Sequence, residues 1–343
     1  MNDETDLDRS NARLADPARR LVLADERRIV IVGARGWIGR TAIDLLREAL
    51  GPDRFAQRVF CFGSADGEIA MGADAAVPQR ALERLSDLDA RPTLLLHLAF
   101  LTKDKVAGMD PAHYEAANRA LSRTVHDALD RIGVDRLFVA SSGAAAFADD
   151  PAAADDLRLY GRLKRDDEEL FARWATASPA VRRLLVGRIY SLSGPWINKY
   201  ETYALASFIL DALAGRSIEV RAPLPVLRSY VAVRELLSFI LTALIEERGE
   251  TVLHFETGGQ PLELGEVAGT VAHLLGGDVV RAALTQDGEN RYVGDNAGWQ
   301  ALLHRFGLSH LPLEGQIMET ASWLAKEVGT DLSMTLAAKT SRC

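Results

Sequence analysis

Cysteine is scarce in this chain of 343 residues, which contains only Cys61 and Cys343, neither of them in a CxxC or cysteine–histidine spacing. A disulfide framework and the common zinc sites are therefore excluded, and no metal ion is expected. Long hydrophobic runs are also missing, since no stretch approaches the roughly 18 apolar residues that suggest a transmembrane helix. The first twenty residues are polar and rich in acids, so we expect no secretory signal there.

Positive charge is in deficit as well, with 40 Lys+Arg against 48 Asp+Glu and a formal net charge of −8. Nucleic acids and anionic membranes both favour a basic patch on their partners, so neither is expected to bind here. The composition, 48% hydrophobic and 26% charged, is typical of a soluble globular protein. We therefore expect a cytoplasmic protein whose partner is a small molecule.

Apolar strand-like runs alternate with helical stretches over the first half of the chain. The β-branched run at 29–32 suits a strand that is buried on both faces of a parallel sheet. Further strands are expected at 59–62, 94–98, 137–140 and 184–189, and helices at 41–50, 111–132 and 159–176. Strands separated by helices of this length predict βαβ units. The predicted fold class is α/β, with a Rossmann-type doubly wound parallel sheet.

The pattern changes after Tyr190, where Gly194-Pro195 and the pair Pro223 and Pro225 interrupt a region of amphipathic helices. Later elements are expected at 205–213 and 264–275 (helices) and at 252–256 (a strand). The predicted segments are an N-terminal extension at 1–26, a dinucleotide-binding domain at 27–189, a smaller substrate-binding lobe at 190–330 and a tail at 331–343. We expect this lobe to be partly interleaved with the sheet. Leu14, Leu21 and Leu23 suggest one short amphipathic helix in the extension, whereas the first ten residues and those from Ser333 are expected to be solvated and frayed.

Three glycines follow the first strand in the spacing GxxGxxG and open a helix. Gly33 allows a sharp turn, Gly36 lets the backbone approach a pyrophosphate, and Gly39 lets the helix lie close to the strand. The start of the helix adds free N–H groups and the positive end of its dipole. An ordinary strand-to-helix turn is the alternative, but the β-branched strand before it favours dinucleotide binding. Trp37 and Ile38, within the turn, are then candidate cofactor contacts.

The acid that usually binds the adenosine ribose, about 20 residues after the glycine turn, is missing. The second strand is followed instead by Gly63 and Ser64. A carboxylate at this place would repel a ribose 2′-phosphate, whereas the Ser64 hydroxyl does not. Arg35, inside the glycine turn, is suited to pair with that phosphate, although a solvated loop cation is the alternative. These two residues favour NADP(H) over NAD(H).

Tyr160 and Lys164 have the spacing YxxxK, which places a phenol and an ammonium on one helical face. Tyrosine has an ordinary pKa of about 10, and the Lys164 ammonium together with the positive nicotinamide of an oxidised cofactor is expected to lower the pKa of Tyr160. The phenol then serves as a general acid or base between an alcohol and a carbonyl. Ser142, at the end of the preceding strand, is the candidate to hydrogen-bond the same substrate oxygen, with Ser141 as its competitor. Taken alone, the YxxxK spacing also fits an exposed helix face.

Together these features resemble the extended short-chain dehydrogenases/reductases, in the group of NAD(P)-dependent nucleotide-sugar epimerases, dehydratases and reductases. The resemblance extends from about Arg27 to Lys326. It rests on residues 33–39, 96–99, 141–143, 188–190, 194–195, 228–231, 255–259 and 291–295, together with Asn118, Tyr160 and Lys164.

The resemblance implies further roles on the cofactor side. Leu98, Ala99 and Phe100 would line the cofactor, and Tyr190 would lie beside the nicotinamide. Asn118 would support an active-site water and the backbone, with a simple tie between helix and strand as the alternative. Lys164 would also hold the nicotinamide ribose, so that both Tyr160 and Lys164 would contact the cofactor.

On the substrate side, the resemblance implies that Arg228 would bind a diphosphate, because a guanidinium matches phosphate oxygens well. A surface ion pair is the alternative for Arg228. Asn198 and Tyr203, which follow Gly194-Pro195, would contact the substrate. The family further implies a homodimer formed through the helices at 111–132 and 159–176.

Three departures from the family narrow the expected reaction. Ser191 stands where the family often has asparagine, and Ala145-Ala146-Phe147 stands where it often has Val-Tyr-Gly. Dehydratases of the group have an Asp-Glu pair at the position of Gly143-Ala144, so dehydration is disfavoured. The expected function is 4-keto reduction or epimerisation of a nucleotide-diphosphate sugar. The alternatives are a reductase or dehydrogenase of a non-sugar carbonyl or alcohol, and a cofactor-binding sensor without turnover.

Overall fold

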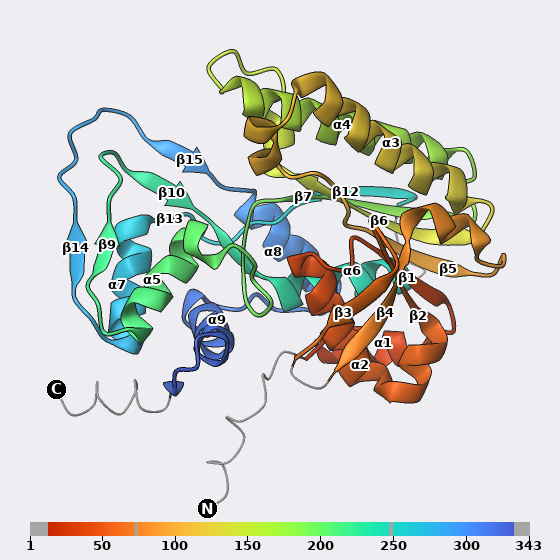
Figure 1. Ribbon diagram of the computed structural model, residues 1–343, viewed down its shortest axis with the longest axis horizontal. Helices are drawn as coiled ribbons and strands as arrows, with labels where there is room; N and C mark the ends of the chain where they lie inside the picture. The colour runs from red at the N-terminus through yellow and green to blue at the C-terminus, as the bar shows by residue number, and fades with distance from the viewer. Residues whose placement is uncertain (1–12, 73–74, 247–249, 333–343) are drawn as a thin grey trace, which may run out of the picture.

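The computed structural model describes residues 13–72, 75–246 and 250–332. The predictions of a solvated tail over the first ten residues and of fraying from Ser333 concern residues outside these ranges, as does Cys343. An eight-stranded sheet has the order β12-β7-β6-β5-β1-β2-β4-β3, in which β3 is antiparallel to β4 and the other neighbours are parallel (Figure 1). Its strands are β1 (Arg28–Val32), β2 (Val59–Gly63), β3 (Gly67–Ala70), β4 (Ala76–Ala81), β5 (Thr93–His97), β6 (Val134–Ser142), β7 (Arg183–Ile189) and β12 (Val252–Glu256). The predicted Rossmann-type sheet is confirmed.

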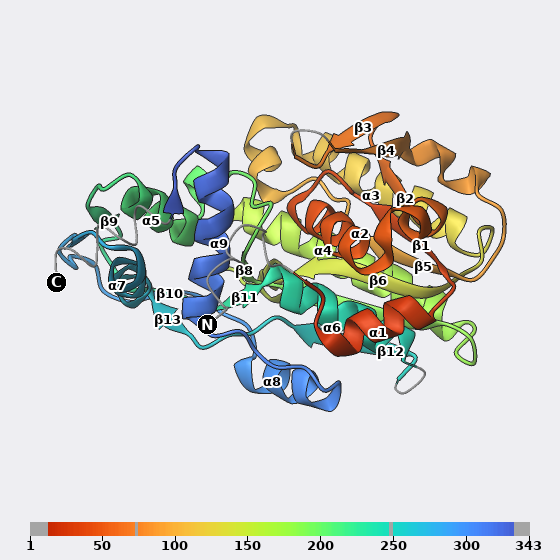
Figure 2. The same cartoon turned by 90° about the horizontal axis from the view of Figure 1, so that it is seen from below.

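Helices cover both faces of the sheet, as Figures 1 and 2 show. One face carries α1 (Asp16–Ala24), α2 (Trp37–Arg58) and α6 (Val233–Ile245), and the other carries α3 (Pro111–Leu129) and α4 (Asp155–Thr176). In β1, Ile29 and Ile31 belong to the first core, whereas Val30 and Val32 belong to the second. Both faces of the strand are therefore buried, which explains its uninterrupted apolar run.

Helix boundaries differ from the predicted ones in three places. The helix predicted at 41–50 begins earlier, at Trp37, and after a break at Gly51 (φ 71°) it resumes through Pro52 to Arg58. Glycine tolerates the left-handed conformation of the break, and proline suits the first turn of the helix that follows. The helix predicted at 111–132 begins where expected but ends at Leu129, and the helix predicted at 159–176 begins at Asp155.

A hairpin that the sequence did not predict follows β2. Strands β3 and β4 form an antiparallel pair at the edge of the sheet, and Ile69 faces Val77 across it. Both side chains are buried, whereas their neighbours along the two strands are mostly exposed. With a single buried residue in β3, the alternation is too short to stand out in the sequence. The hairpin, followed by the 3-10 helix at Leu82–Asp87, fills the stretch between the second and third predicted strands, for which no element was predicted.

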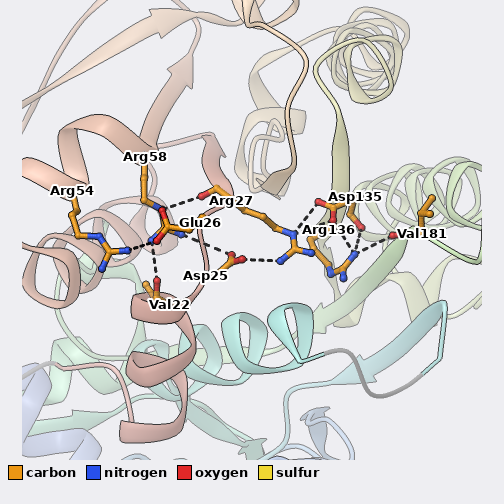
Figure 3. A network of polar contacts seen from close by, with 9 residues as sticks. All are labelled: Val22, Asp25, Glu26, Arg27, Arg54, Arg58, Asp135, Arg136 and Val181. Atoms are coloured by element: carbon orange, nitrogen blue, oxygen red, sulfur yellow. Dashed lines mark hydrogen bonds and ion pairs between the residues drawn. The ribbon is translucent and has the colours of Figure 1, made fainter.

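The predicted amphipathic helix near the N-terminus is α1, which lies along α6 (Figure 2). Its buried residues are Ala18 and Val22, with Leu14 just before the helix, while Leu21 and Leu23 are only half-buried. Buried and charged residues then join the end of α1 to the amino ends of β1 and β6 (Figure 3). Asp25 accepts a hydrogen bond from Arg27 at 2.7 Å, and Arg27 also donates to Asp135 at 3.0 Å. This network therefore lies at the amino ends of the strands, on the side of the sheet away from their carboxyl ends.

The second half of the chain builds a smaller lobe and also returns to the sheet, through α6 and β12. Three small sheets have the orders β13-β10-β15, β11-β8 and β14-β9. The strands are β8 (Ser191–Ser193), β9 (Ile218–Val220), β10 (Val226–Arg228), β11 (Tyr230–Ala232), β13 (Leu262–Glu263), β14 (Val279–Arg281) and β15 (Asn290–Tyr292). The helices of this half are α5 (Ala204–Leu213), α7 (Leu264–Leu275), α8 (Asn296–Arg305) and α9 (Leu313–Glu327). Across the described residues, the short 3-10 helices are η1 (Leu82–Asp87), η2 (Lys103–Gly108), η3 (Gly143–Phe147) and η4 (Tyr200–Thr202). Within the described residues, no helix is both long and apolar enough to cross a membrane.

Candidate functional site

A cavity of about 630 Å³ lies at the carboxyl ends of β1, β5, β6 and β7 and extends to the smaller lobe. From β1 the chain continues to β2 on one side of the sheet, and from β5 to β6 on the other side. Such a reversal of strand order is where open α/β sheets bind ligands. The predicted site residues that line the cavity are Gly33, Gly36, Trp37, Ile38, Gly39, Leu98, Phe100, Ser142, Tyr160, Lys164, Tyr190, Asn198, Tyr203 and Arg228. Arg35, Ser64, Ala99 and Asn118 are not among its lining residues.

The glycine turn forms a close backbone junction between β1 and α2. Gly33 has φ 91°, and a Cβ atom on it would lie 2.6 Å from the backbone nitrogen of Ala99. A Cβ atom on Gly39 would lie 2.6 Å from the carbonyl oxygen of Gly33. Neither position therefore accepts a side chain without backbone movement. The turn leaves the start of α2, at Trp37, beside the cavity, where its free N–H groups favour an anion.

Ala99 and Asn118 support this turn from the side of β5. Leu98 continues the sheet by donating its N–H to the carbonyl of Val32 at 2.9 Å, which brings Ala99 against Gly33. The Asn118 side chain is buried and accepts the N–H of Leu101 at 2.8 Å. Asn118 therefore fixes the loop after β5 and does not itself reach the cavity. This geometry agrees with the simpler alternative for Asn118, a tie between helix and loop.

Arg35 and Ser64 are both exposed, near the β3–β4 hairpin. The Arg35 guanidinium donates to the carbonyl of Glu68 at 3.3 Å, a long hydrogen bond at the surface. The nearest acid after β2, Asp66, accepts the N–H of Ala81 at 2.9 Å. Arg35 therefore lies beside the turn after β2. Asp66 does not pair with it, because the Asp66 carboxylate is hydrogen-bonded to Ala81.

Lys164 is fixed beneath the cavity by three contacts. Its side chain is buried, and its ammonium donates to the carbonyl of Ala140 at 2.7 Å. The same nitrogen lies 3.7 Å from the ring centroid of Phe100 and 5.9 Å from that of Tyr160. Burial lowers the pKa of Lys164 to about 8, while the nearby carboxylates of Asp167 and Glu168 oppose that change. The helical spacing thus brings phenol and ammonium together, as predicted.

The pKa of Tyr160, however, is shifted in the direction opposite to the one expected from its neighbour. Burial raises the pKa of Tyr160, the neighbouring phenol of Tyr292 adds to the rise, and a hydrogen bond with Ser142 opposes it. The prediction considered the charges of Lys164 and of an oxidised nicotinamide, but not the larger effect of burial. The chain alone therefore keeps Tyr160 protonated, and a lower pKa requires further positive charge in the cavity.

The two serines at the end of β6 have different partners. Ser141 donates its hydroxyl to Glu168, whose carboxylate also accepts from Arg188 at 3.0 and 2.9 Å. Ser142 instead bonds with Tyr160 and lies 3.2 Å from the Tyr292 hydroxyl. The Ser141 hydroxyl is thus engaged by Glu168 of this ion pair, and the geometry favours Ser142 over its competitor.

Arg228 enters the cavity from β10 in the smaller lobe. Its guanidinium donates to the carbonyl and side-chain oxygens of Asn290, at 3.1 and 3.0 Å. No carboxylate among the described residues pairs with it, and partial burial lowers its pKa. The alternative of a surface ion pair for Arg228 is therefore wrong. Asn198 and Tyr203 lie at the same cavity, both exposed, and Tyr203 makes an edge contact with Trp37 at 5.6 Å.

Tyr292 is a cavity residue that the sequence analysis did not identify as a site residue. It comes from β15, where it is paired with Arg228 of β10. Its ring lies 4.8 Å from that of Tyr190. The segment 291–295 was recognised as similar to the family's C-terminal part, but nothing in it indicated a contact with Ser142, 150 positions earlier.

Comparisons with known proteins identify the family of this chain. The model of a family described as the NAD dependent epimerase/dehydratase family matches residues 29–258, which include the glycine turn, Tyr160, Lys164 and Arg228. A comparison with curated proteins finds no match.

Solved structures similar to this chain include three sugar-nucleotide enzymes. UDP-glucose 4-epimerase of Thermotoga maritima, solved with UDP-glucose, has a TM-score of 0.65 at 18% identity, over 88% of this chain and 99% of that one. UDP-glucose 4-epimerase of Thermus thermophilus, solved with NAD, has a TM-score of 0.62 at 20% identity, over 86% and 98%. The dTDP-glucose 4,6-dehydratase DesIV of Streptomyces venezuelae has a TM-score of 0.63 at 18% identity, over 88% and 98%. At these identities the likeness shows the fold.

Proposed function

Because the chain belongs to the NAD dependent epimerase/dehydratase family, and is thus an NAD(P)-dependent enzyme of the short-chain dehydrogenase/reductase type, we propose that it reduces or epimerises a nucleotide-diphosphate sugar. NADP(H) is the favoured cofactor. The observation that carries the proposal is that one cavity contains the glycine turn, Tyr160 with Lys164, and the guanidinium of Arg228. A cofactor site, an acid–base pair and an anion site are thus within reach of one ligand.

The residues at the glycine turn fit a dinucleotide. At Gly33 and Gly39, neighbouring backbone atoms leave no space for a side chain. The start of α2 faces the cavity. Gly36 and the first N–H groups of α2 would hold the pyrophosphate, while Leu98, Ala99 and Phe100 support the same turn. When bound, the cofactor supplies hydride transfer to and from a carbon of the substrate.

The chain's own residues would then handle the proton and the substrate oxygen. The hydroxyl of Tyr160 would give its proton to a carbonyl oxygen, or its phenolate would take a proton from an alcohol, with Ser142 donating a hydrogen bond to the same oxygen. Lys164 is held close to Tyr160, and its positive charge would assist the phenolate, together with the charge of an oxidised cofactor. Tyr190 would lie beside the nicotinamide.

Reduction or epimerisation is favoured over dehydration by the surroundings of Gly143. A Cβ atom at this position would lie 2.4 Å from the ring of Tyr190. The ring of Tyr190 also lies against Tyr292, and its hydroxyl donates to Glu256 at 3.4 Å. An acidic side chain at residue 143 would therefore require the Tyr190 ring to move, which supports the expectation that this chain does not use the Asp-Glu pair of the dehydratases.

A turnover panel tests the proposal. The purified protein is incubated with NADPH or NADH and with UDP-, GDP-, CDP- and dTDP-linked sugars and 4-keto sugars, and products are separated by mass and by chromatography. We expect turnover of at least one of them. Turnover of only a phosphate-free ketone would replace the proposal by a non-sugar reductase, and cofactor binding without any turnover would replace it by a sensor.

Cofactor choice provides the first prediction. Arg35→Ala is expected to weaken NADPH binding by on the order of ten- to a hundredfold, because a hydrogen bond between charged groups is lost, and to change NADH binding less. Ser64→Asp is expected to shift preference toward NADH by placing a carboxylate near the 2′-phosphate. Fluorescence titration with both cofactors measures each effect, with Arg221→Ala, exposed in the smaller lobe, as a control. Equal losses for both cofactors would show that Arg35 does not contact the phosphate.

A homodimer through the outer surfaces of α3 and α4 is also proposed. The two helices lie side by side on one face of the sheet, away from the smaller lobe (Figure 1). Two copies joined there would form a four-helix bundle without covering the cavity. Light scattering at micromolar concentration is expected to give twice the mass of one chain, and the mass of a single chain would disprove the dimer.

A further inference from the structure

The phenol of Tyr292 lies in the catalytic part of the cavity although it belongs to the smaller lobe. Its hydroxyl is 3.2 Å from Ser142 Oγ, at the end of β6. Its ring is stacked with Phe147, at 6.3 Å and 23° between planes, and tilted against Tyr190 at 4.8 Å. The other residues of β15 are exposed, whereas Tyr292 is half-buried. The strand therefore presents this one side chain to the sheet.

Either hydroxyl can donate in the contact between Ser142 and Tyr292, and counting hydrogen bonds shows what each choice leaves for a substrate. A serine hydroxyl has one proton to donate and two positions that accept, and a phenol likewise donates one proton. The backbone N–H of Ala144 donates to Ser142 at 3.2 Å and also faces the Tyr292 oxygen. The Tyr292 oxygen can accept from this N–H while its own proton points to Ser142. Ser142 then accepts from Ala144 and Tyr292, and its single proton is left for Tyr160 or for a substrate oxygen.

The opposite arrangement would be unproductive. If Ser142 donated to Tyr292, it would have no proton for the substrate oxygen, and only its acceptor positions would face the cavity. We infer that Tyr292 is a positioning residue, which donates to Ser142 and thereby directs the serine proton toward the reacting oxygen. This inference rests on the proposed function, because it assumes that Ser142 hydrogen-bonds the substrate.

The position of Tyr292 also links the two parts of the molecule. Ser142 belongs to the eight-stranded sheet, whereas Tyr292 is held by β10 of the smaller lobe, opposite Arg228. The residue that would bind the diphosphate and the residue that orients Ser142 are thus neighbours on paired strands.

A double-mutant cycle tests the inference, with Tyr292→Phe, Ser142→Ala and the double variant measured on the substrate found by the panel. Tyr292→Phe keeps the ring and removes the donor, and we expect kcat to fall by about three- to tenfold, the value of one hydrogen bond, with KM changed less than twofold. On the Ser142→Ala background the same change is expected to have almost no further effect. Tyr200→Phe, outside the cavity lining, is the control. A loss of equal factor in both backgrounds, or a loss confined to KM, would overturn the positioning role.

A second measurement needs no substrate. Thermal unfolding of the same variants reports the hydrogen bond itself, and we expect the double variant to lose no more in Tm than the larger single variant. Fully additive Tm losses would show that the two hydroxyls do not interact, and would overturn the inference even without turnover. Failure of the proposed function appears differently, as wild-type protein that converts none of the nucleotide sugars while the Tm losses remain non-additive.

Discussion

Tyr160→Phe is expected to lower turnover by about 10²–10⁴, the usual contribution of a positioned acid or base, while folding and cofactor binding remain intact. The change removes one hydroxyl and keeps the ring, which makes an edge contact with Phe100 at 5.7 Å. Phe100 in turn lies against the Lys164 ammonium, so the packing around that charge is preserved. Steady-state rates, cofactor titration and thermal unfolding measure the three properties separately.

The matched control is Tyr200→Phe, the same chemical change at a tyrosine that does not line the cavity. It is expected to leave turnover within about twofold of wild type, because the ring of this half-buried tyrosine keeps its packing and its hydroxyl does not line the cavity. A Tyr160→Phe variant that keeps more than about a tenth of the wild-type rate would contradict the assigned role. Weakened cofactor binding together with lost turnover would instead indicate damage to the cavity.

The parts of the site that could be predicted are those whose residues lie close together in the sequence. Gly33, Gly36 and Gly39 indicate a backbone junction because a strand, turn and helix occupy consecutive residues. Tyr160 and Lys164 are placed together by helical geometry alone, and the structure brings them together as predicted. In each case the distance along the chain already determines the distance in space.

Contacts between distant segments could not be predicted in this way. Tyr292 meets Ser142 only because β15 pairs with β10, and such register is not visible in a three-residue strand. The pKa direction at Tyr160 was missed for a related reason, since burial depends on every element around the cavity, whereas the effect of Lys164 could be read from its spacing. The β3–β4 hairpin is similarly fixed by pairing at the sheet edge.

Arg228→Ala is expected to raise KM for a nucleotide-diphosphate sugar by on the order of ten- to a hundredfold, with a smaller effect on kcat. The diphosphate is distant from the reacting carbon and is bound in the ground state and the transition state alike, so its contact contributes mainly to binding. Arg228 is suited to this task because no carboxylate of the described residues neutralises it, in a chain with a net charge of −8. Its bonds to Asn290 hold the guanidinium in one orientation before any ligand arrives.

Arg228→Lys separates charge from geometry. An ammonium keeps the positive charge but loses the planar fork that binds two phosphate oxygens, so only part of the affinity is expected to return. Arg221→Ala is the control, since Arg221 belongs to the same lobe but is exposed and paired with Glu219 at 2.7 Å. Competitive inhibition by UDP, GDP, CDP and dTDP tests the diphosphate contact without chemistry, because all four share the group that Arg228 would bind. If Arg228→Ala changes none of their inhibition constants while it lowers kcat, Arg228 acts on the reacting end of the substrate and not on a diphosphate.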